Sequence, residues 1–290
     1  MKATTQPIKW PAEAIWEQIA PILPNFTVEV LPEIDSTNTE LMRRAKAGHI
    51  EPILLVAEKQ TAGRGRLGRE WHDLAPRLET VPTLTFSLGL PLSPFNWSGL
   101  SLAVGLSIAT SLHADLGLKW PNDLWLNDRK LAGILIETCA VVNTVSNQRY
   151  VVIGVGINIT KPQVAQEISQ KLDQTLPAQQ LRRAPAWLQE LLPHTSAPEA
   201  LLRIAPDLIQ TLLIFTEQGF APFQARFHQR DVLRDRQITV DDNQVDGNNK
   251  TSGSKTSGMA LGVNSNGELE IQTAHGKKAI NSSEVSISPL

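Results

Sequence analysis

An arginine- and glycine-rich segment at residues 61–71, TAGRGRLGREW, has the residue types with the clearest chemical potential in this chain. Glycine lets a backbone approach a ligand closely, and an arginine guanidinium can donate two parallel hydrogen bonds to a carboxylate or phosphate. The alternation therefore predicts a loop that folds over an anionic ligand and becomes ordered when the ligand binds. The residues concerned are Gly63, Arg64, Gly65, Arg66, Gly68 and Arg69.

Other interpretations of this segment are weaker. Its GxGxxG spacing matches a dinucleotide-binding turn, but that turn needs a helix directly after the last glycine, and REWHDLAPRLETVP has two prolines and no apolar stripe. An arginine hook for the DNA minor groove needs more basic surroundings than a chain with a formal net charge of -2 provides. A solvated surface turn remains the plain structural alternative.

A second polar cluster lies at a predicted helix N-terminus. Ser36, Thr37 and Asn38 come just before or within NTELMRRAKAG, where Thr37 and Glu40 have the spacing of a capping box and Gly48 ends the helix. The buried strand ILLVAE at 53–58 then leads into the arginine-rich loop. Ser36, Thr37 and Asn38 are therefore expected at a helix N-terminus, where hydroxyl groups can turn toward a ligand.

A predicted hairpin, LKWPNDLWLNDRKLAGILIE, supplies further polar residues. Asn127 and Asp128 have turn chemistry between its two alternating strands. The next predicted strand, YVVIGVGINIT, has two glycines where a ligand or another backbone can approach. The hairpin's polar residues are Lys119, Asn122 and Asp123 on the first arm and Lys130 just past the turn.

The remaining segments predict an α+β protein with a mixed sheet flanked by helices. We expect helices at 10–22 and from Ser98 to Gly117, a strand in TLTFSLGL, and mainly helical structure over 161–230. Short β-prone runs after residue 232 predict a small all-β unit. The expected domains are 1–231 and 232–290, with a flexible loop at about 243–258.

Composition narrows the functional classes. The near-neutral charge argues against a protein that coats nucleic acid or anionic membrane. The single cysteine, Cys139, excludes a disulfide framework, and no segment has the pattern of a signal peptide or membrane span. We therefore expect a soluble protein of the cytoplasm.

Four motifs in order, IDSTN, QTAGRGRLGREW, KWPNDLWLNDRKLAGILIE and VIGVGIN, resemble those of the biotin protein ligases. The similarity runs from about residue 30 to about 160 and resumes more weakly in TEQGFAPFQARF and the β-rich tail. The resemblance implies the biotin/lipoate ligase catalytic fold, class II synthetase-like, with an SH3-like C-terminal barrel. It also implies that ATP and Mg²⁺ activate biotin for attachment to a biotin carboxyl carrier protein, such as that of acetyl-CoA carboxylase.

Residue roles follow from the resemblance alone. It implies catalytic roles for Arg66, Lys130 and Asp123, and Mg²⁺ held through phosphates with no assigned protein ligands. The implied nucleotide-binding residues are Arg66, Arg69, Lys119, Asn122 and Asn158. The implied biotin-binding residues are Ser36, Thr37, Asn38, Gln60, Gly63, Arg64, Gly65, Arg66, Lys130 and Gly133.

Several alternatives stay open. A lipoate ligase or octanoyl transferase shares the implied fold, and a non-catalytic biotin-binding module is the rival from another class. Some relatives carry an N-terminal helix-turn-helix domain and repress transcription, but only 35 residues precede Ser36 here, so we expect no operator binding. Residues 72–82 and 161–185 depart from the family pattern, and nothing in the sequence decides whether the protein forms a homodimer.

Overall fold

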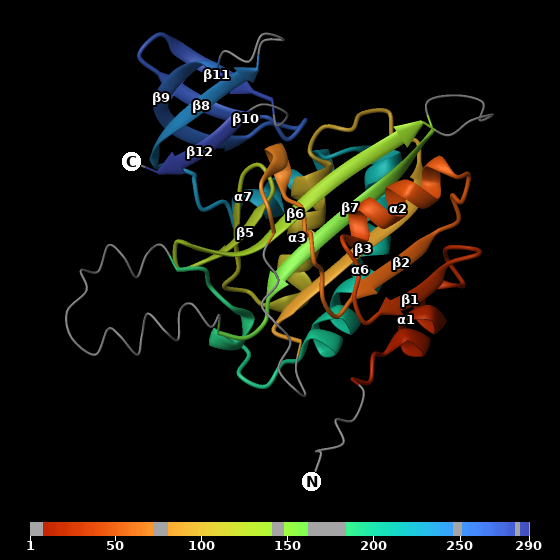
Figure 1. Ribbon diagram of the computed structural model, residues 1–290. Helices are drawn as coiled ribbons and strands as arrows, with labels where there is room; N and C mark the ends of the chain where they lie inside the picture. Colours follow the sequence, from red (N-terminus) through yellow and green to blue (C-terminus); the bar gives the residue numbers. More distant parts are fainter. Residues whose placement is uncertain are drawn as a thin grey trace.

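The computed structural model describes residues 8–71, 81–140, 148–161, 184–245, 251–281 and 285–289, and it contains two separate β-sheets (Figure 1). The larger sheet has the strand order β1-β2-β3-β7-β6-β5-β4. Strands β1 and β2 are parallel and the other neighbours are antiparallel, which confirms the predicted mixed sheet. Its strands are β1 (Thr27–Leu31), β2 (Ile53–Ala57), β3 (Thr83–Leu92), β4 (Gly117–Lys119), β5 (Asp123–Leu126), β6 (Arg129–Ala140) and β7 (Arg149–Asn158).

Helices cover both faces of this sheet, and the alternation of side chains along each strand explains how. On β2, Leu55 packs with Leu41 of α2 in a small core, whereas Leu54 and Val56 belong to the large core on the opposite face. The large core also contains the buried faces of α1, α3 and α6. The helices are α1 (Ala12–Ile19), α2 (Thr37–Lys46), α3 (Leu100–Leu112), α6 (Ala197–Gln218) and α7 (Gln224–His228), with 3₁₀ turns η1 (Arg66–Gly68), η2 (Leu188–Glu190) and η3 (Ala221–Phe223).

The C-terminal strands form a second, five-stranded antiparallel sheet in the order β11-β10-β9-β8-β12, which lies at one end of the larger sheet (Figure 1). This confirms the predicted small all-β unit, while its closure into an SH3-like barrel and the boundary at 231/232 remain predictions. The predicted flexible loop at about 243–258 is wrong in extent, because β8 reaches Val245 and β9 begins at Thr251; residues 246–250 lie outside the described part. The strands are β8 (Gln237–Val245), β9 (Thr251–Val263), β10 (Leu269–Thr273), β11 (Gly276–Ile280) and β12 (Val285–Pro289).

Two predicted helix ends need correction. The N-cap of α2 is Ser36, whose Oγ accepts from the Thr39 N–H at 3.4 Å, so the capping box predicted at Thr37 and Glu40 is wrong by one residue. Glu40 bonds to two arginines of the same helix instead. Helix α3 ends at Leu112, and Gly117 begins β4 rather than closing the helix.

The predicted hairpin is confirmed at its turn, where Asn127 and Asp128 have positive φ values of 49° and 58°. Its first arm differs from the prediction. The chain reverses between Lys119 and Asp123, so that β4 and β5 pair antiparallel with each other. The motif KWPND therefore forms a turn of its own at the sheet end.

None of the described helices combines the length and the apolar character that crossing a bilayer needs.

Candidate functional site

The four motifs meet at one pocket of about 190 Å³ beside the larger sheet. It is lined from the N-terminus of α2, the segment after β2, the turn between β4 and β5, and the strands β6 and β7. Thirteen of the predicted site residues line it: Ser36, Thr37, Asn38, Gln60, Arg64, Gly65, Arg66, Arg69, Lys119, Asn122, Asp123, Lys130 and Gly133.

Two predicted site residues do not line the pocket. Gly63 is buried at the base of the arginine-rich segment, where an added Cβ would lie 2.4 Å from the Trp71 carbonyl oxygen. Asn158 is buried at the end of β7, and its Nδ2 donates to the Ala186 carbonyl at 3.0 Å. Both therefore have a structural role in the described residues, and their predicted ligand contacts remain predictions.

The arginine-rich segment is itself a small hairpin, which we call the 63–71 hairpin. The Trp71 N–H donates to the Gly63 carbonyl at 2.9 Å and the Gly65 N–H to the Arg69 carbonyl at 2.7 Å. A single 3₁₀ turn, η1, forms its tip, and no α-helix starts at Gly68. A dinucleotide-binding turn needs that helix, so the structure agrees with its exclusion.

The N-terminus of α2 makes one half of the pocket neutral and rich in hydrogen-bonding groups. Ser36, Thr37 and Asn38 are only 2–3% exposed. The Gln60 Oε1 accepts from the Thr37 backbone N–H at 2.9 Å and lies 3.2 Å from the Thr37 hydroxyl. This contact joins the start of the helix to the segment that leads into the 63–71 hairpin.

Ser87 of β3 is a further member of this half that the sequence reasoning missed. Its Oγ lies 2.6 Å from the Asn38 Oδ1 and 2.7 Å from the Thr37 Oγ1. Because an amide oxygen only accepts, the Ser87 hydroxyl donates to Asn38 and can accept from Thr37. The available signal was a polar residue at every second position, Thr85 and Ser87, in an otherwise apolar buried strand.

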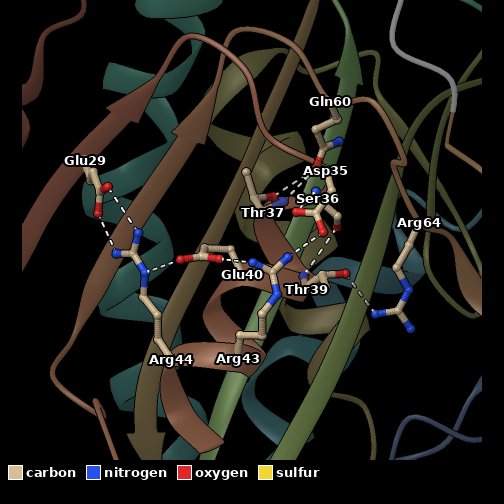
Figure 2. Close-up of polar contacts among 10 residues, drawn as sticks. All are labelled: Glu29, Asp35, Ser36, Thr37, Thr39, Glu40, Arg43, Arg44, Gln60 and Arg64. Carbon is tan, nitrogen blue, oxygen red and sulfur yellow. Dashed lines mark hydrogen bonds and ion pairs between the residues drawn. The ribbon is translucent and has the colours of Figure 1, made fainter. Parts of the chain in front are cut away.

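Charged side chains tie α2 to the chain that precedes it. Arg43 contacts both Asp35 and Glu40, and Arg44 bridges Glu40 and Glu29 of β1 (Figure 2). Burial opposes ionisation of Asp35, but the N–H of Ser36 and the guanidinium of Arg43 outweigh it and lower the pKa of Asp35. This network holds the helix whose first residues line the pocket.

The other half of the pocket is cationic. Lys130 Nζ forms an ion pair with Asp123 Oδ1 at 2.6 Å, and Arg66 donates to the Asn122 Oδ1 at 3.0 Å. Burial lowers the pKa of both Arg66 and Lys119, while Asp123 works in the opposite direction. Arg69 adds to the lowering at both sites. The cationic side chains that line the pocket outnumber the carboxylates, Asp123 and Glu70, and this excess of positive charge favours an anionic ligand.

Trp71 forms part of the pocket wall, against Gly133 of β6 and Gly156 of β7. An added Cβ at Gly156 would lie 2.4 Å from the Trp71 Cε2, and one at Gly133 would lie 3.3 Å from the Trp71 Cζ3. The missing side chains of these glycines therefore leave the space that the indole ring occupies. Its Nε1 is buried without a hydrogen-bond partner among the described residues. Trp120 differs, because it is 1% exposed and its Nε1 donates to the Gly267 carbonyl of the C-terminal unit at 3.0 Å.

Comparison with known sequences agrees with this geometry. The profile of the Biotin/lipoate A/B protein ligase family matches residues 30–158. A biotin–[acetyl-CoA-carboxylase] ligase of Mycobacterium tuberculosis is 39% identical over 142 residues, which are 46% of this chain and 50% of that protein. The bifunctional ligase/repressor BirA of Escherichia coli is 32% identical over 242 residues, 77% of this chain and 65% of BirA. The chain thus spans half to about two thirds of the length of these relatives.

Comparison of structures extends the likeness to almost the whole chain. The biotin protein ligase of Aquifex aeolicus, solved in complex with biotin and ATP, matches with a TM-score of 0.65 and 26% identity. The match covers 92% of this chain and 100% of that one. The catalytic fold, the order of the motifs and their meeting in one pocket agree with the match of residues 30–158 to the biotin/lipoate A/B protein ligase family.

Proposed function

We propose that this protein is a biotin protein ligase, which activates biotin with ATP to biotinyl-5′-AMP and transfers the biotinyl group to a lysine of a carrier protein. One observation carries the proposal: a single pocket joins a neutral hydrogen-bonding half to a cationic half. Biotin has the matching order of groups, with a ureido ring at one end and a carboxylate at the other.

The neutral half favours biotin over the alternative substrates, lipoate and octanoate. Ser36, Thr37, Asn38 and Gln60 offer hydroxyl and amide groups that suit a ureido ring, which both donates and accepts hydrogen bonds. The dithiolane of lipoate and the methyl end of octanoate cannot pair with these groups. A site that offers hydrogen bonds to its substrate rejects an analogue that cannot make them.

The cationic half suits the first reaction step. A carboxylate oxygen of biotin attacks the α-phosphorus of ATP, and pyrophosphate leaves. The reacting groups carry like charge, so bringing them together requires cationic donors aimed at the charge that develops in the transition state. We assign Arg66 and Lys130 to this task and Lys119, Asn122 and Arg69 to the nucleotide.

In the second step, the carrier lysine amine attacks the carbonyl of the mixed anhydride, AMP leaves, and the amine loses a proton. Asp123 lines the pocket and already binds a cation, Lys130. We propose that Asp123 accepts the proton of the incoming amine. The 63–71 hairpin, which lines the same pocket, would keep water from hydrolysing the adenylate.

Mg²⁺ belongs to the proposal as the partner of ATP. Among the described residues, no three His, Cys, Asp or Glu side chains gather into a metal site. Mg²⁺ does not need such a group, because proteins commonly hold it through substrate phosphates, water and one or two carboxylates. Asp123 is the carboxylate that could contribute, and bound Mg²⁺ would supply neutralisation of phosphate charge.

The decisive experiment combines the protein with ATP, Mg²⁺, biotin and the apo form of a biotin carboxyl carrier domain, and then weighs the carrier. We expect a mass gain of one biotinyl group, dependent on ATP. An unchanged carrier mass would support a non-catalytic module, and an equal gain with lipoate in place of biotin would support the lipoate alternative.

The other partner assignments remain proposals with simple tests. We infer that an acetyl-CoA carboxylase carrier is the acceptor, as the names of the ligases from Mycobacterium tuberculosis and Paracoccus denitrificans state for those proteins. We also propose residence in the cytoplasm and no binding to operator DNA, which cell fractionation and a gel-shift titration would check. Sedimentation with and without biotin and ATP would decide whether a homodimer forms.

A further inference from the structure

Glu137 of β6 contacts two predicted site residues, although the proposed reaction gives it no role. Its Oε2 accepts from the Asn38 Nδ2 at 3.0 Å, and its Oε1 lies 3.0 Å from the Arg64 Nη2. A second nitrogen of Arg64 donates to Oε2 at 3.2 Å. One carboxylate therefore joins the N-terminus of α2 to the 63–71 hairpin.

The first contact determines how the Asn38 amide is oriented. The Asn38 side chain bonds to two strands that flank β7. Its Oδ1 accepts from Ser87 of β3, and its Nδ2 donates to the Leu135 carbonyl of β6 at 3.3 Å. Both Ser87 and Leu135 pair with Gly154 of β7. A carboxylate can only accept, so Glu137 requires the Asn38 NH₂ group, and not its oxygen, to face β6.

The second contact, between Glu137 and Arg64, shows that the two central arginines of the hairpin have different surroundings. The Arg64 side chain is 47% exposed, pairs with Glu137, and also reaches Thr39 of α2 at 3.4 Å (Figure 2). Arg66 is more buried and faces Asn122 and Asp123 in the cationic half. The charge of Arg64 is thus balanced by Glu137, whereas the Arg66 side chain lies in the cationic half of the pocket.

We propose that Glu137 is a positioning residue, which holds the Asn38 amide in its ligand-binding orientation and fastens the 63–71 hairpin to β6 through Arg64. The part that concerns the ligand rests on the proposed function, because it takes biotin as the molecule that Asn38 contacts. The fastening of the hairpin does not depend on the ligand. Arg64 accordingly acts as a structural link, and Arg66 as the group that meets the anion.

A set of four variants tests both parts: Glu137→Ala, Glu137→Gln, Arg64→Gln, and the double variant Arg64→Gln with Glu137→Ala. The control is Glu270→Gln, which breaks an ion pair with Lys277 in the C-terminal unit. The exposures of that pair, 23% and 55%, closely match those of Glu137 and Arg64, 22% and 47%. The control therefore reports what the loss of a similar ion pair does away from the pocket.

Hydrogen exchange of the ligand-free protein measures the fastening. The reporters are the Gly65 and Trp71 amides, which bond across the hairpin. We expect Glu137→Ala and Arg64→Gln each to speed their exchange about threefold, in keeping with the modest strength of partly exposed ion pairs. The double variant should exchange no faster than Glu137→Ala, because both changes remove the same contact.

Biotin affinity, measured by calorimetry, tests the positioning of Asn38. We expect Glu137→Ala to raise the biotin Kd about tenfold, because it removes a charge-assisted partner of a buried amide. Glu137→Gln should fall between Glu137→Ala and wild type, since its amide oxygen can still accept from Asn38. Arg64→Gln should raise the Kd by less than Glu137→Ala does, because Asn38 keeps its partners and only the contribution of Arg64 itself is lost. Turnover at saturating biotin should change little in Glu137→Gln, which distinguishes positioning from catalysis.

Opposite outcomes overturn the proposal. Unchanged biotin affinity in Glu137→Ala would refute the positioning of Asn38, and additive exchange effects, or exchange equal to that of Glu270→Gln, would refute the fastening of the hairpin. A wild-type protein that binds no biotin would refute the proposed function and the Asn38 part with it, while the exchange rates would still decide the role of the Glu137–Arg64 pair. Glu137→Gln is nearly isosteric and keeps the test valid if Glu137→Ala fails to fold.

Discussion

Replacement of Gly154 by alanine should abolish tight biotin binding without preventing folding. An added Cβ would lie 2.0 Å from the Asn38 Oδ1 and 2.7 Å from its Cγ. Ordinary contacts between carbon and oxygen begin at about 3.3 Å, so Asn38 would have to withdraw by about 1.3 Å. That movement is too large for the hydrogen bonds from Ser87 and to Glu137 to survive, at 2.6 Å and 3.0 Å in the native protein.

The expected magnitudes differ for binding and stability. Overpacking one methyl group in a rigid interior costs about 1–3 kcal/mol of unfolding free energy, which lowers the Tm by roughly 2–12 °C in a domain of this size. Displacement of Asn38 removes a ligand contact and misplaces Thr37, its neighbour in the same cluster. We therefore expect the biotin Kd to rise by about a hundredfold, from two lost contacts of about 1.4 kcal/mol each.

Gly89→Ala provides the matched control for this prediction. Gly89 lies on β3 of the same sheet, where an added Cβ would be 2.2 Å from the Tyr150 hydroxyl and 3.1 Å from Leu41, outside the pocket. Both variants should lose similar stability by calorimetric melting, but only Gly154→Ala should lose biotin affinity by titration calorimetry. Equal loss of affinity in both variants, or native affinity in Gly154→Ala, would refute the reasoning.

Three further predictions concern other parts of the molecule. Arg66→Ala should speed release of biotinyl-adenylate about tenfold or more, as measured by filter retention of the labelled intermediate; native retention would count against an anion-binding role. Gly267→Ala should lower the free energy of unfolding by about 1–3 kcal/mol, because the added Cβ would lie 2.6 Å from the Gly99 Cα. It should also raise the KM for ATP through Trp120, which donates to the Gly267 carbonyl. An unchanged Tm in calorimetric melting would contradict this. Burial raises the pKa of Asp231 from 3.8 to about 6. The folded state therefore binds this proton more tightly than the unfolded state, and protonation stabilises the fold. The stabilisation is fully present below about pH 4 and is lost as the pH rises through 6. Asp231→Asn should therefore raise the Tm above pH 7 and leave it unchanged at pH 4; the same gain at both pH values would show that charge is not the cause.

The elements and the pocket were predictable because their signals are local. The strand β6, the turn at Asn127 and Asp128, and the buried run of β2 each have their signal in a short stretch of sequence, and the structure confirms these elements. Ordered motifs then indicated which side chains share a site, and thirteen of them line one pocket. The errors at the α2 cap and the α3 end are local as well, because both depend on which of several adjacent residues first leaves helical geometry.

Contacts between distant strands were not predictable from these patterns. Ser87 reaches Asn38 only because β3 and β7 pair in a register that sets Ser87 opposite Gly154. Glu137 faces the same side of the sheet because it is two residues beyond Leu135 on β6. Register is a property of the assembled sheet, so a polar residue in a single strand does not reveal which helix residue it will contact.

The geometry of the 63–71 hairpin also explains why its two central arginines do different work. In an extended strand, residues two apart face the same side, so Arg64 and Arg66 would reach toward the same ligand. Here Arg64 lies in the extended arm, where its backbone forms an antiparallel β-bridge with Glu70. Arg66 begins the 3₁₀ turn η1, where the backbone changes direction. The turn sends Arg64 toward Glu137 and Arg66 toward Asn122. Two arginines that look equivalent in the sequence are thus separated by one turn of backbone, which directs one side chain to Glu137 and the other to Asn122.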